Sequence, residues 1–389
     1  MQGIEREYCD VCINALIGAW QELMEVSSAE TLRSVRYGKG DTLGLDAIPE
    51  LIISKRLMNF DNHSLLITEE LDHFAHERWP TGSDSTKQPL MFFSDPTDRS
   101  KQLKLFLQKI SKDNPLAKVG ELMNNCDSQK IWEEMFESPV TITGPTGAIS
   151  CVRKGVVIFS VILNYVTATI FVATDTGIYY YKFEDSSILK NEKITLADIS
   201  KEGKILSFPG IREFGYSPDD CKRFVTFLGK TGYKENFRDS MIFVEEPDNF
   251  VHHSEPPGPP RVLYLSELQK GYGPIGFILS NGEKIGEWMH WLPFVKYSRN
   301  SDGEHALQVF EISLERPWTK DGMLMSTSPA YSVFCKKNGE EGGFLDISRL
   351  HNFKHPNRFR SMIVVVPYDN ERIIHVLEQH QYREVTTFF

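Results

Sequence analysis

A stretch of β-forming residues, 140–182, constrains the fold of this chain more than any other feature. β-Branched and aromatic residues dominate it, and turn residues interrupt it at Gly147, at Lys154-Gly155 and at 175–177. Runs of this kind, separated by turn signals, are typical of antiparallel strands joined by short connections. The pattern therefore predicts a β-meander that forms a large part of a central sheet.

Helical patterns lie on both sides of this stretch. Apolar residues at spacings of three and four predict a helix over 4–35, and similar patterns predict helices over 46–58 and 217–232. The chain ends in a predicted strand, 362–367, followed by a predicted helix, 371–380. The order of helix, mixed strands and helix indicates an α/β protein built in layers.

The length of 389 residues favours one large layered unit or two domains. We place the division after residue 205, which gives an N-terminal α/β domain, 1–205, and a C-terminal α/β domain, 206–389. The N-terminal domain would carry the acidic motifs described below, and the C-terminal domain would contribute substrate contacts.

The charge balance argues against large anionic partners. The net charge is −10, from 53 acidic and 43 basic residues, so we expect neither nucleic acid nor a membrane surface as a partner. No apolar run reaches the roughly 18 residues of a membrane-spanning helix, and the start lacks the pattern of a secretory signal. An anionic small ligand would need a divalent cation to offset the carboxylates.

Cysteine usage indicates a reducing compartment. The chain has six cysteines, and its Cys9-x-x-Cys12 pair lies in a helix-like run, with no second pair at zinc-site spacing. We interpret these residues as ordinary reduced thiols and predict a cytoplasmic location.

Carboxylates directly follow two short apolar strands of the predicted sheet. They are Glu69 and Glu70 after residues 64–67, and Asp95 and Asp98 after residues 90–93. If the two strands are neighbours, their carboxyl ends lie side by side, and the acids converge at one edge of the sheet. Acid pairs at strand ends can also be simply solvated, and Asp-Pro begins many turns.

Pro96 gives the second group a defined shape. It fixes a tight turn between Asp95 and Asp98 and could direct both carboxylates and the Thr97 carbonyl toward one point. Such hard oxygen donors suit Mg²⁺, which keeps some of its sites for water and substrate phosphate. The two groups together favour a metal site over a chance arrangement of surface acids.

These motifs resemble those of the metal-dependent, lithium-sensitive phosphatase superfamily of the inositol monophosphatases and fructose-bisphosphatases. That superfamily has an E-E pair after one strand and D-P-[IL]-D-[GS]-[ST] after the next. The corresponding segments here are Thr68-Glu69-Glu70 and Asp95-Pro96-Thr97-Asp98-Arg99-Ser100. The upstream segment from Lys39 to Asp46 is similar to the family's K-x-D-x-x-x-x-D.

Later segments resemble the fructose-bisphosphatase branch more than the inositol branch. They are 172–178, 203–207, 213–216, 302–311 and 329–331. The resemblance extends over roughly residues 36–380. It implies a five-layer α-β-α-β-α sandwich, two or three Mg²⁺ ions with Mn²⁺ as a substitute, and assembly into a dimer or tetramer.

The resemblance also implies roles for particular residues. The metal ligands would be Glu69, Asp95, Thr97 through its carbonyl, Asp98, Glu311 and Asp41. The catalytic residues would be Asp46, Ser100 and Glu70, of which the first two orient and deprotonate the attacking water. Tyr216 would contact a phosphate of the substrate, and His305 stands at the position of a phosphate-contacting lysine. Arg99 is not part of the family pattern; it could compete with a cation or bind the substrate phosphate through two hydrogen bonds.

Several positions differ from the family pattern, among them Glu213, which stands near the family's phosphate-binding asparagine. Arg99 stands where the family has Gly or Ser, His305 stands where it has Lys, and Glu311 matches only if 312–328 is an insertion. Two functions are therefore open. The first is Mg²⁺-dependent hydrolysis of a phosphate monoester of a small phosphorylated metabolite, with a sugar (bis)phosphate as the favoured class. The second is a catalytically degenerate member of the same fold that acts as a binding or regulatory protein.

A further segment, 288–291, places two tryptophans around Met289 and His290. It could line a pocket, but such a group is more often packed aromatic core.

Overall fold

A computed structural model describes most of the N-terminal half of the chain and short segments of the rest. The described residues are 3–36, 42–68, 78–79, 90–137, 140, 144–153, 156–183, 193–202, 204–205, 241–246, 249–253, 276–279, 290, 293–294, 297, 307–313, 330–333, 361–367 and 383–384. The chain divides into two compact units. The first comprises Met1–Leu206 with Gly258–Val262 and Gly286–Phe294, and the second comprises the remainder.

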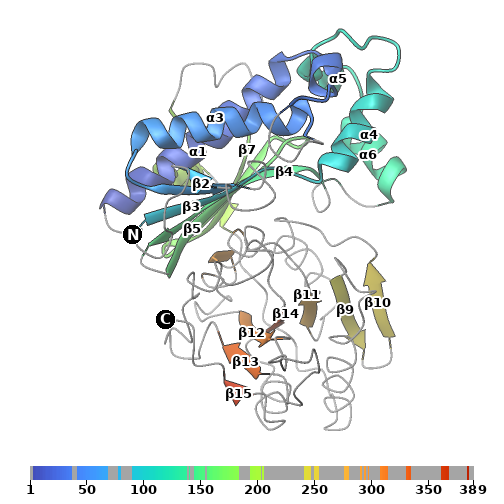
Figure 1. Ribbon diagram of the computed structural model, residues 1–389. Coiled ribbons are helices and arrows are strands. Elements are labelled where there is room, and N and C mark those ends of the chain that lie inside the picture. The colour runs from blue at the N-terminus through green and yellow to red at the C-terminus, as the bar shows by residue number, and fades with distance from the viewer. Residues whose placement is uncertain are drawn as a thin grey trace, which may run out of the picture. The chain divides into compact units, whose positions relative to one another are not determined.

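The first unit is built on an eight-stranded sheet (Figure 1). In spatial order its strands are β2 (Arg78–Trp79), β1 (Leu65–Thr68), β3 (Leu90–Asp98), β4 (Thr146–Arg153), β5 (Val156–Asn164), β6 (Thr169–Thr174), β7 (Gly177–Lys182) and β8 (Lys204–Ile205). Strands β4 to β7 are consecutive antiparallel neighbours, so the predicted meander is confirmed. β1 and β3 run parallel to each other.

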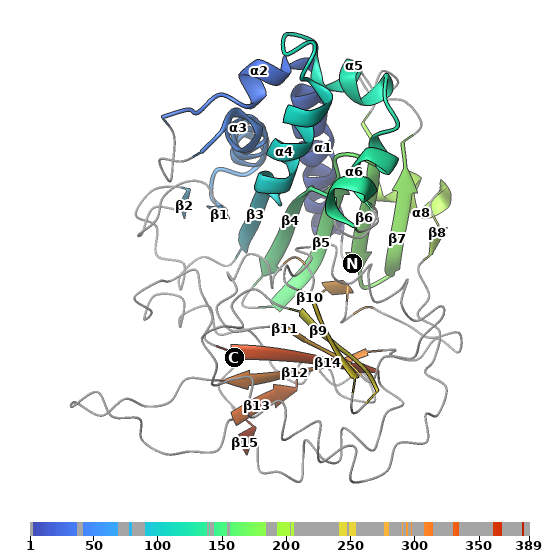
Figure 2. The ribbon, with the colours of Figure 1, turned by 90° about the vertical axis from the view of Figure 1, so that its right-hand side faces the viewer.

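The helices of this unit are α1 (Gly3–Glu25), α2 (Ser28–Thr31), α3 (Gly44–Phe60), α4 (Ser100–Ile110), α5 (Val119–Asn124), α6 (Ser128–Phe136) and α8 (Leu196–Glu202). Figures 1 and 2 show α1 and α3 lying together across one face of the sheet. Fully buried residues of α1, including Leu16 and Leu23, share one apolar core with Ile149 of β4 and Val161 of β5. Because alternate residues of a strand point to opposite faces, Phe92 joins this core, whereas Phe93 faces the other side.

The α/β class is confirmed, whereas the first predicted helix was too long. α1 ends at Glu25, and the chain is extended at Ser27, whose hydroxyl accepts the N–H of Glu30 at 3.2 Å. The carbonyl of Val26 accepts the N–H of Val119 at 2.9 Å. The Glu30 N–H and the Val26 carbonyl thus have partners outside helix α1, whereas in a continuous helix they would bond to other residues of that helix. The helix predicted over 46–58 is observed as α3.

The second unit contains a seven-stranded sheet. In spatial order its strands are β10 (Asn249–His253), β9 (Met241–Glu246), β11 (Gly276–Leu279), β14 (Ser361–Pro367), β12 (Leu307–Ser313), β13 (Ala330–Val333) and β15 (Arg383–Glu384). The strand predicted over 362–367 is observed as β14. The helices predicted over 217–232 and 371–380 lie outside the described residues.

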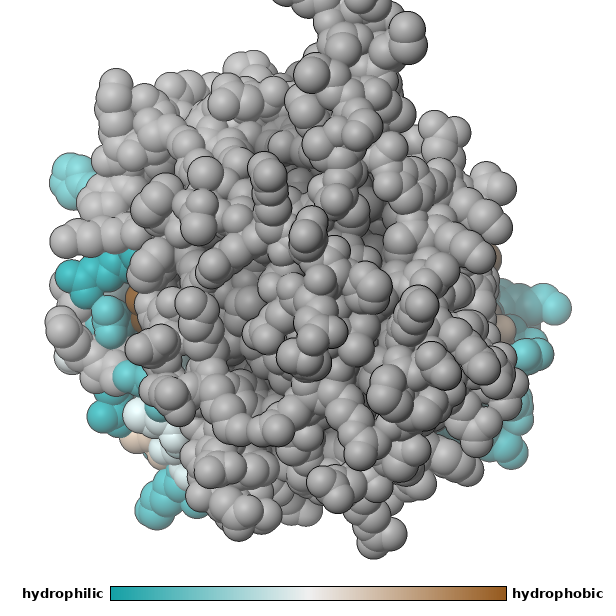
Figure 3. Space-filling view, turned by 90° about the horizontal axis from the view of Figure 1, so that it is seen from below, coloured by the Kyte–Doolittle hydropathy of each residue, from teal (hydrophilic) through white to brown (hydrophobic). Residues whose placement is uncertain are grey.

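The described side chains visible in Figure 3 are mainly hydrophilic, and within the described part of the chain no helix combines the length and apolar character needed to cross a membrane.

Cys9, Cys12 and Cys151 are buried and free, and burial raises the pKa of all three thiols. High thiol pKa values make these cysteines poor nucleophiles.

The second face of the sheet carries a buried polar chain that reaches His290. The hydroxyl of Ser150 on β4 donates to Ser160 on β5 at 3.1 Å and lies 2.7 Å from Nδ1 of His290. Since the Ser150 proton is used toward Ser160, Nδ1 of His290 is the donor to Ser150. His290 is fully buried, and its Nε2 has no hydrogen-bond partner among the described residues. For His290, the interpretation of 288–291 as packed core is the one that holds.

Burial of His290 predicts a loss of stability in acid. Burial lowers the pKa of His290 from 6.5 to about 3. Below pH 6.5 the unfolded chain therefore binds a proton that the folded protein does not, and stability falls as the pH drops from 6.5 toward 3. The expected slope is about 1.4 kcal/mol per pH unit. Urea unfolding between pH 7 and 5 measures it, and His290→Gln should flatten the dependence, whereas the same substitution at exposed His63 is the control.

Candidate metal centre

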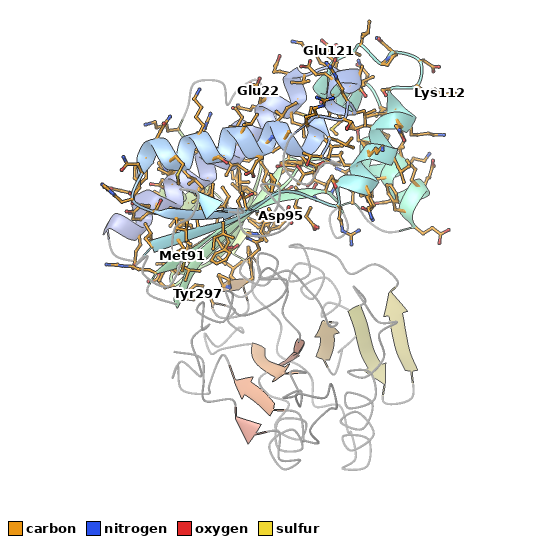
Figure 4. The ribbon with its side chains drawn as sticks, in the orientation of Figure 1. Glu22, Met91, Asp95, Lys112, Glu121 and Tyr297 are labelled. Atoms are coloured by element: carbon orange, nitrogen blue, oxygen red, sulfur yellow. The ribbon has the colours of Figure 1, made fainter. Side chains whose placement is uncertain are left out.

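The strands that precede the two acidic motifs lie side by side. β1 and β3 are parallel, and Thr68 at the end of β1 is paired with Ser94 of β3. The next residue along β3 is Asp95, which is only 2% exposed. Figure 4 labels Met91 near one end of β3 and Asp95 toward the other end. The predicted neighbouring of the strands is thus observed, and Glu69 follows Thr68 directly in the chain, although Glu69 and Glu70 lie outside the described residues.

The Asp-Pro-Thr-Asp segment forms a bulge on β3. Asp95 pairs with Ala148 of β4 and Asp98 pairs with Thr146, so three steps along β3 match two along β4. The extra residue bends the strand and redirects its side chains. We name residues 95–98 the acidic turn. β3 thus extends through the motif, although the sequence predicted that its strand ended at residue 93.

Thr97 fastens the acidic turn to helix α3. Its hydroxyl donates to the carbonyl oxygen of Leu45 at 2.8 Å. In a regular helix that carbonyl would accept from the N–H of residue 49, but residue 49 is Pro49, which has none. Pro49 therefore leaves the buried Leu45 carbonyl without its helical donor, and the Thr97 hydroxyl takes that place. This hydrogen bond holds the side chain of Thr97, the residue whose main-chain carbonyl was predicted to bind the metal.

Asp46 lies beside this anchor, in the first turn of α3. It is 5% exposed, and one of its carboxylate oxygens accepts the N–H of Leu43 at 3.2 Å. A carboxylate at this position caps the helix and is favoured by the helix dipole. The same side chain was predicted to act on the attacking water, and capping fixes its orientation.

Electrostatic effects on Tyr165 show that Asp46 and Asp95 share one neighbourhood. Burial raises the pKa of Tyr165 well above its usual range, and the charges of Asp95 and Asp46 raise it further. Tyr165 lies in the turn between β5 and β6, and the sequence analysis did not identify it. No local signal marks it, because Asp46 and the residues of the acidic turn near its side chain are more than sixty positions away.

Glu50, also missed from the sequence, connects α3 to the end of β1. It is fully buried one turn after Asp46, and its Oε2 accepts the hydroxyl of Thr68 at 2.5 Å. The hydroxyl of Ser54 donates to the main-chain carbonyl of Glu50 at 2.7 Å. The spacing of four residues from Asp46 was a signal that could have indicated Glu50, since residues four apart share a helix face.

Arg99 and Ser100 begin helix α4. Ser100 is the first helical residue and is partly exposed, whereas Arg99 precedes it with φ 62° and ψ 35°, the left-handed conformation. A residue with a Cβ atom is strained in this region, whereas glycine is not. Glycine would adopt this left-handed conformation without strain. Arg99 adopts it with an unfavourable contribution to the free energy of folding.

Arg99→Gly is expected to stabilise the protein. Relief of the left-handed strain should raise the free energy of unfolding by about 1 kcal/mol, measurable as a higher urea midpoint. Lys101→Gly, an exposed position inside α4, is the matched control and should lower it by about the same amount. Equal destabilisation by both substitutions would contradict the strain at Arg99.

The remaining predicted residues lie outside the described residues or in the second unit. Asp41, Glu69, Glu70, Tyr216 and His305 lie outside the described residues. Glu311 lies in β12 of the second unit, where its backbone pairs with Ser332 and Ile363.

The donor set of the acidic turn suits a hard cation. It offers the carboxylates of Asp95 and Asp98 and main-chain carbonyls, all oxygen donors of the kind Mg²⁺ prefers. The described residues contain no group of three His, Cys, Asp or Glu side chains placed to hold a metal. The predicted partners Glu69, Glu70 and Asp41 would complete the set.

Comparison with known proteins gives structural similarity without sequence similarity. No protein-family model matches the chain, and no curated protein matches it by sequence. Among solved structures, the chain is similar to CysQ from Bacteroides thetaiotaomicron, a bacterial member of the inositol monophosphatase family. The TM-score is 0.44 and the identity 11%, over 92% of this chain and 97% of that one.

Two further similar structures are a fructose-1,6-bisphosphatase and an inositol monophosphatase. Fructose-1,6-bisphosphatase from Leishmania major gives a TM-score of 0.32 at 10% identity, over 58% of this chain and 64% of that one. Inositol monophosphatase from Anabaena gives 0.28 at 11% identity, over 46% and 48%. Both groups that the motifs resemble are thus represented among the solved structures similar to this chain. At these scores the similarities carry no argument about function, and the site residues have to carry it.

Proposed function

We propose that this protein is a Mg²⁺-dependent phosphatase that hydrolyses a phosphate monoester of a small phosphorylated metabolite, with sugar mono- and bisphosphates as the favoured class. The observation that carries the proposal is the acidic turn. Asp95 and Asp98 stand on a bulge at the end of β3, next to the end of β1, and Thr97 joins that bulge to the helix turn that holds Asp46.

In this proposal the acidic turn binds the cation. Asp95, Asp98 and the Thr97 carbonyl would hold Mg²⁺, which would act as a Lewis acid toward the phosphate oxygens. Asp46 and Ser100 would orient a water molecule in line with the ester bond. The water would attack phosphorus as the bond to the leaving oxygen breaks. Asp46 would accept one proton of that water, and the departing alkoxide would take a proton from a solvent water molecule; Asp46 would then return its proton to the solvent.

Phosphate recognition would fall to the start of α4. The first N–H groups of a helix have no partner within it and favour an anion, and Ser100 begins a helix of 11 residues here. The Arg99 guanidinium can contact a phosphate through two parallel hydrogen bonds. We propose Tyr216 and His305 as further phosphate contacts. We also propose a cytoplasmic location and assembly into a homo-oligomer, a dimer or a tetramer.

A second candidate function follows from Arg99. A cation adjacent to Asp98 inside the motif could take the place of a metal, which would leave a protein of the same fold that binds a ligand without hydrolysing it. The effect of Arg99→Gly on turnover separates the two candidates. A gain would mean that Arg99 hinders the metal, and a loss would mean that it binds the substrate.

The decisive experiment is phosphate release from sugar mono- and bisphosphates, inositol phosphates and phosphoadenosine, with and without Mg²⁺. Release that needs Mg²⁺ and is suppressed by lithium would support the proposal and identify the substrate class. No release from any of these compounds, by a sample shown to be folded by circular dichroism, would favour the second candidate.

A further inference from the structure

Tyr165 is held rigidly on the scaffold at both ends of its main chain. Its carbonyl accepts the indole N–H of Trp20 on α1 at 3.1 Å, and its own N–H donates to the carbonyl of Pro145 at 2.9 Å. The side chain is only 1% exposed. The backbone of Tyr165 is therefore tied to α1 and to Pro145, the residue before β4, and its side chain is enclosed by protein.

From this fixed position the phenol reaches into the acidic turn. Its hydroxyl donates a hydrogen bond to the carbonyl oxygen of Pro96, the residue between Asp95 and Thr97. A phenol is ordinarily protonated near neutral pH, so the Tyr165 hydroxyl has the proton that this hydrogen bond needs.

The packing around this hydroxyl is tight. A Cβ atom at Gly147 would lie 2.3 Å from the Tyr165 hydroxyl oxygen and 2.9 Å from the ring carbon that bears it. Glycine at this point of β4 is what leaves room for the contact. The arrangement gives a second way to disturb the same hydrogen bond without changing Tyr165.

We propose that Tyr165 is a positioning residue for the acidic turn: its bond to the Pro96 carbonyl fixes the backbone that presents Asp95, Thr97 and Asp98 to a divalent cation. The inference rests on the proposed function only in assuming that this turn binds such a cation. Tyr165 itself does not touch the ion. Partners that orient metal ligands in this way typically change metal affinity by about 10- to 100-fold.

The test is direct binding of Mn²⁺, measured from the electron paramagnetic resonance signal of the free ion. Tyr165→Phe keeps the ring and removes only the donor, and it should weaken Mn²⁺ binding by about 10-fold or more. In the phosphatase assay, the Mg²⁺ concentration for half-maximal rate should rise by a similar factor, and saturating Mg²⁺ should restore most of the maximal rate. A merely structural role would lower stability without changing the affinity of the folded protein.

Tyr179→Phe is the matched control. The Tyr179 hydroxyl also donates to a main-chain carbonyl, that of Thr176 at 2.9 Å, but in the turn between β6 and β7. This variant should bind Mn²⁺ as the unmodified protein does. Gly147→Ala should reproduce the loss of affinity seen with Tyr165→Phe, and it provides the test if Tyr165→Phe does not fold.

The outcomes separate the two proposals. Unchanged Mn²⁺ affinity in folded Tyr165→Phe or folded Gly147→Ala would overturn the role of Tyr165 and leave the phosphatase proposal standing. Both proposals would be overturned if the unmodified protein did not bind Mn²⁺, or if it bound Mn²⁺ and Asp95→Asn left that binding intact.

Discussion

Replacing Asp95 by asparagine is expected to reduce Mg²⁺-dependent phosphate release by at least about a hundredfold and to leave the protein folded. The carboxylate is a proposed metal ligand, and Lewis-acid assistance by a metal is worth several kcal/mol, each 1.36 kcal/mol being a factor of about ten in rate. The measurement is phosphate release as a function of Mg²⁺ concentration, with the best substrate from the panel.

The fold should survive because asparagine has the same shape as aspartate. Asp95 is 2% exposed and lies within the electrostatic neighbourhood of Asp46, so the amide removes one of two nearby buried charges. We expect the free energy of unfolding to change by less than about 1 kcal/mol. Asp113→Asn, an exposed aspartate after α4, is the control and should keep full activity. Near-normal turnover by Asp95→Asn would mean that the assigned site is wrong.

Replacing Thr97 by valine is expected to destabilise the protein by about 1–3 kcal/mol, the usual cost of a buried acceptor that loses its partner. Valine keeps the shape of threonine but removes the hydroxyl that serves the Leu45 carbonyl. Pro49 cannot donate in its place. The midpoint of urea unfolding, measured at constant slope, gives the value.

A double-mutant cycle with Pro49→Ala tests the physical reason. The alanine introduced by this substitution would have an N–H directed along the helix toward the Leu45 carbonyl, so Thr97→Val should cost about 1 kcal/mol less in the Pro49→Ala background. Thr169→Val is the matched control, because its hydroxyl also donates to a main-chain carbonyl, that of Thr167 at 3.2 Å, away from α3. Its effect should add to that of Pro49→Ala. Full additivity for Thr97 as well would show that the proline and the threonine do not share an acceptor.

Both predictions concern the same small part of the molecule. The acidic turn is fastened to α3 through Thr97 and to the β5–β6 turn through Tyr165. Ligands of a metal that prefers a near-octahedral geometry have to be held in place before the ion arrives, because Mg²⁺ tolerates little distortion. Rigid support of this turn is what a metal site of the proposed kind requires.

The sequence by itself determined the elements and the order of the motifs. Alternation of β-branched residues with turn residues indicated the meander from β4 to β7, and helical periodicity indicated α3 within two residues at each end. The acids after the two apolar strands, and Pro96 between Asp95 and Asp98, indicated the acidic turn. All of these are local signals, carried by residues within a few positions of one another.

Only the tertiary structure decided what holds the turn. Thr97 meets the acceptor left by Pro49 from 52 positions away, and Tyr165 reaches Pro96 from 69 positions away. Glu50 meets Thr68 across 18 positions. The left-handed backbone of Arg99 and the burial of His290 likewise depend on packing. Hydrogen bonds between distant residues depend on how strands and helices come together, and periodicity along the chain has no information about that.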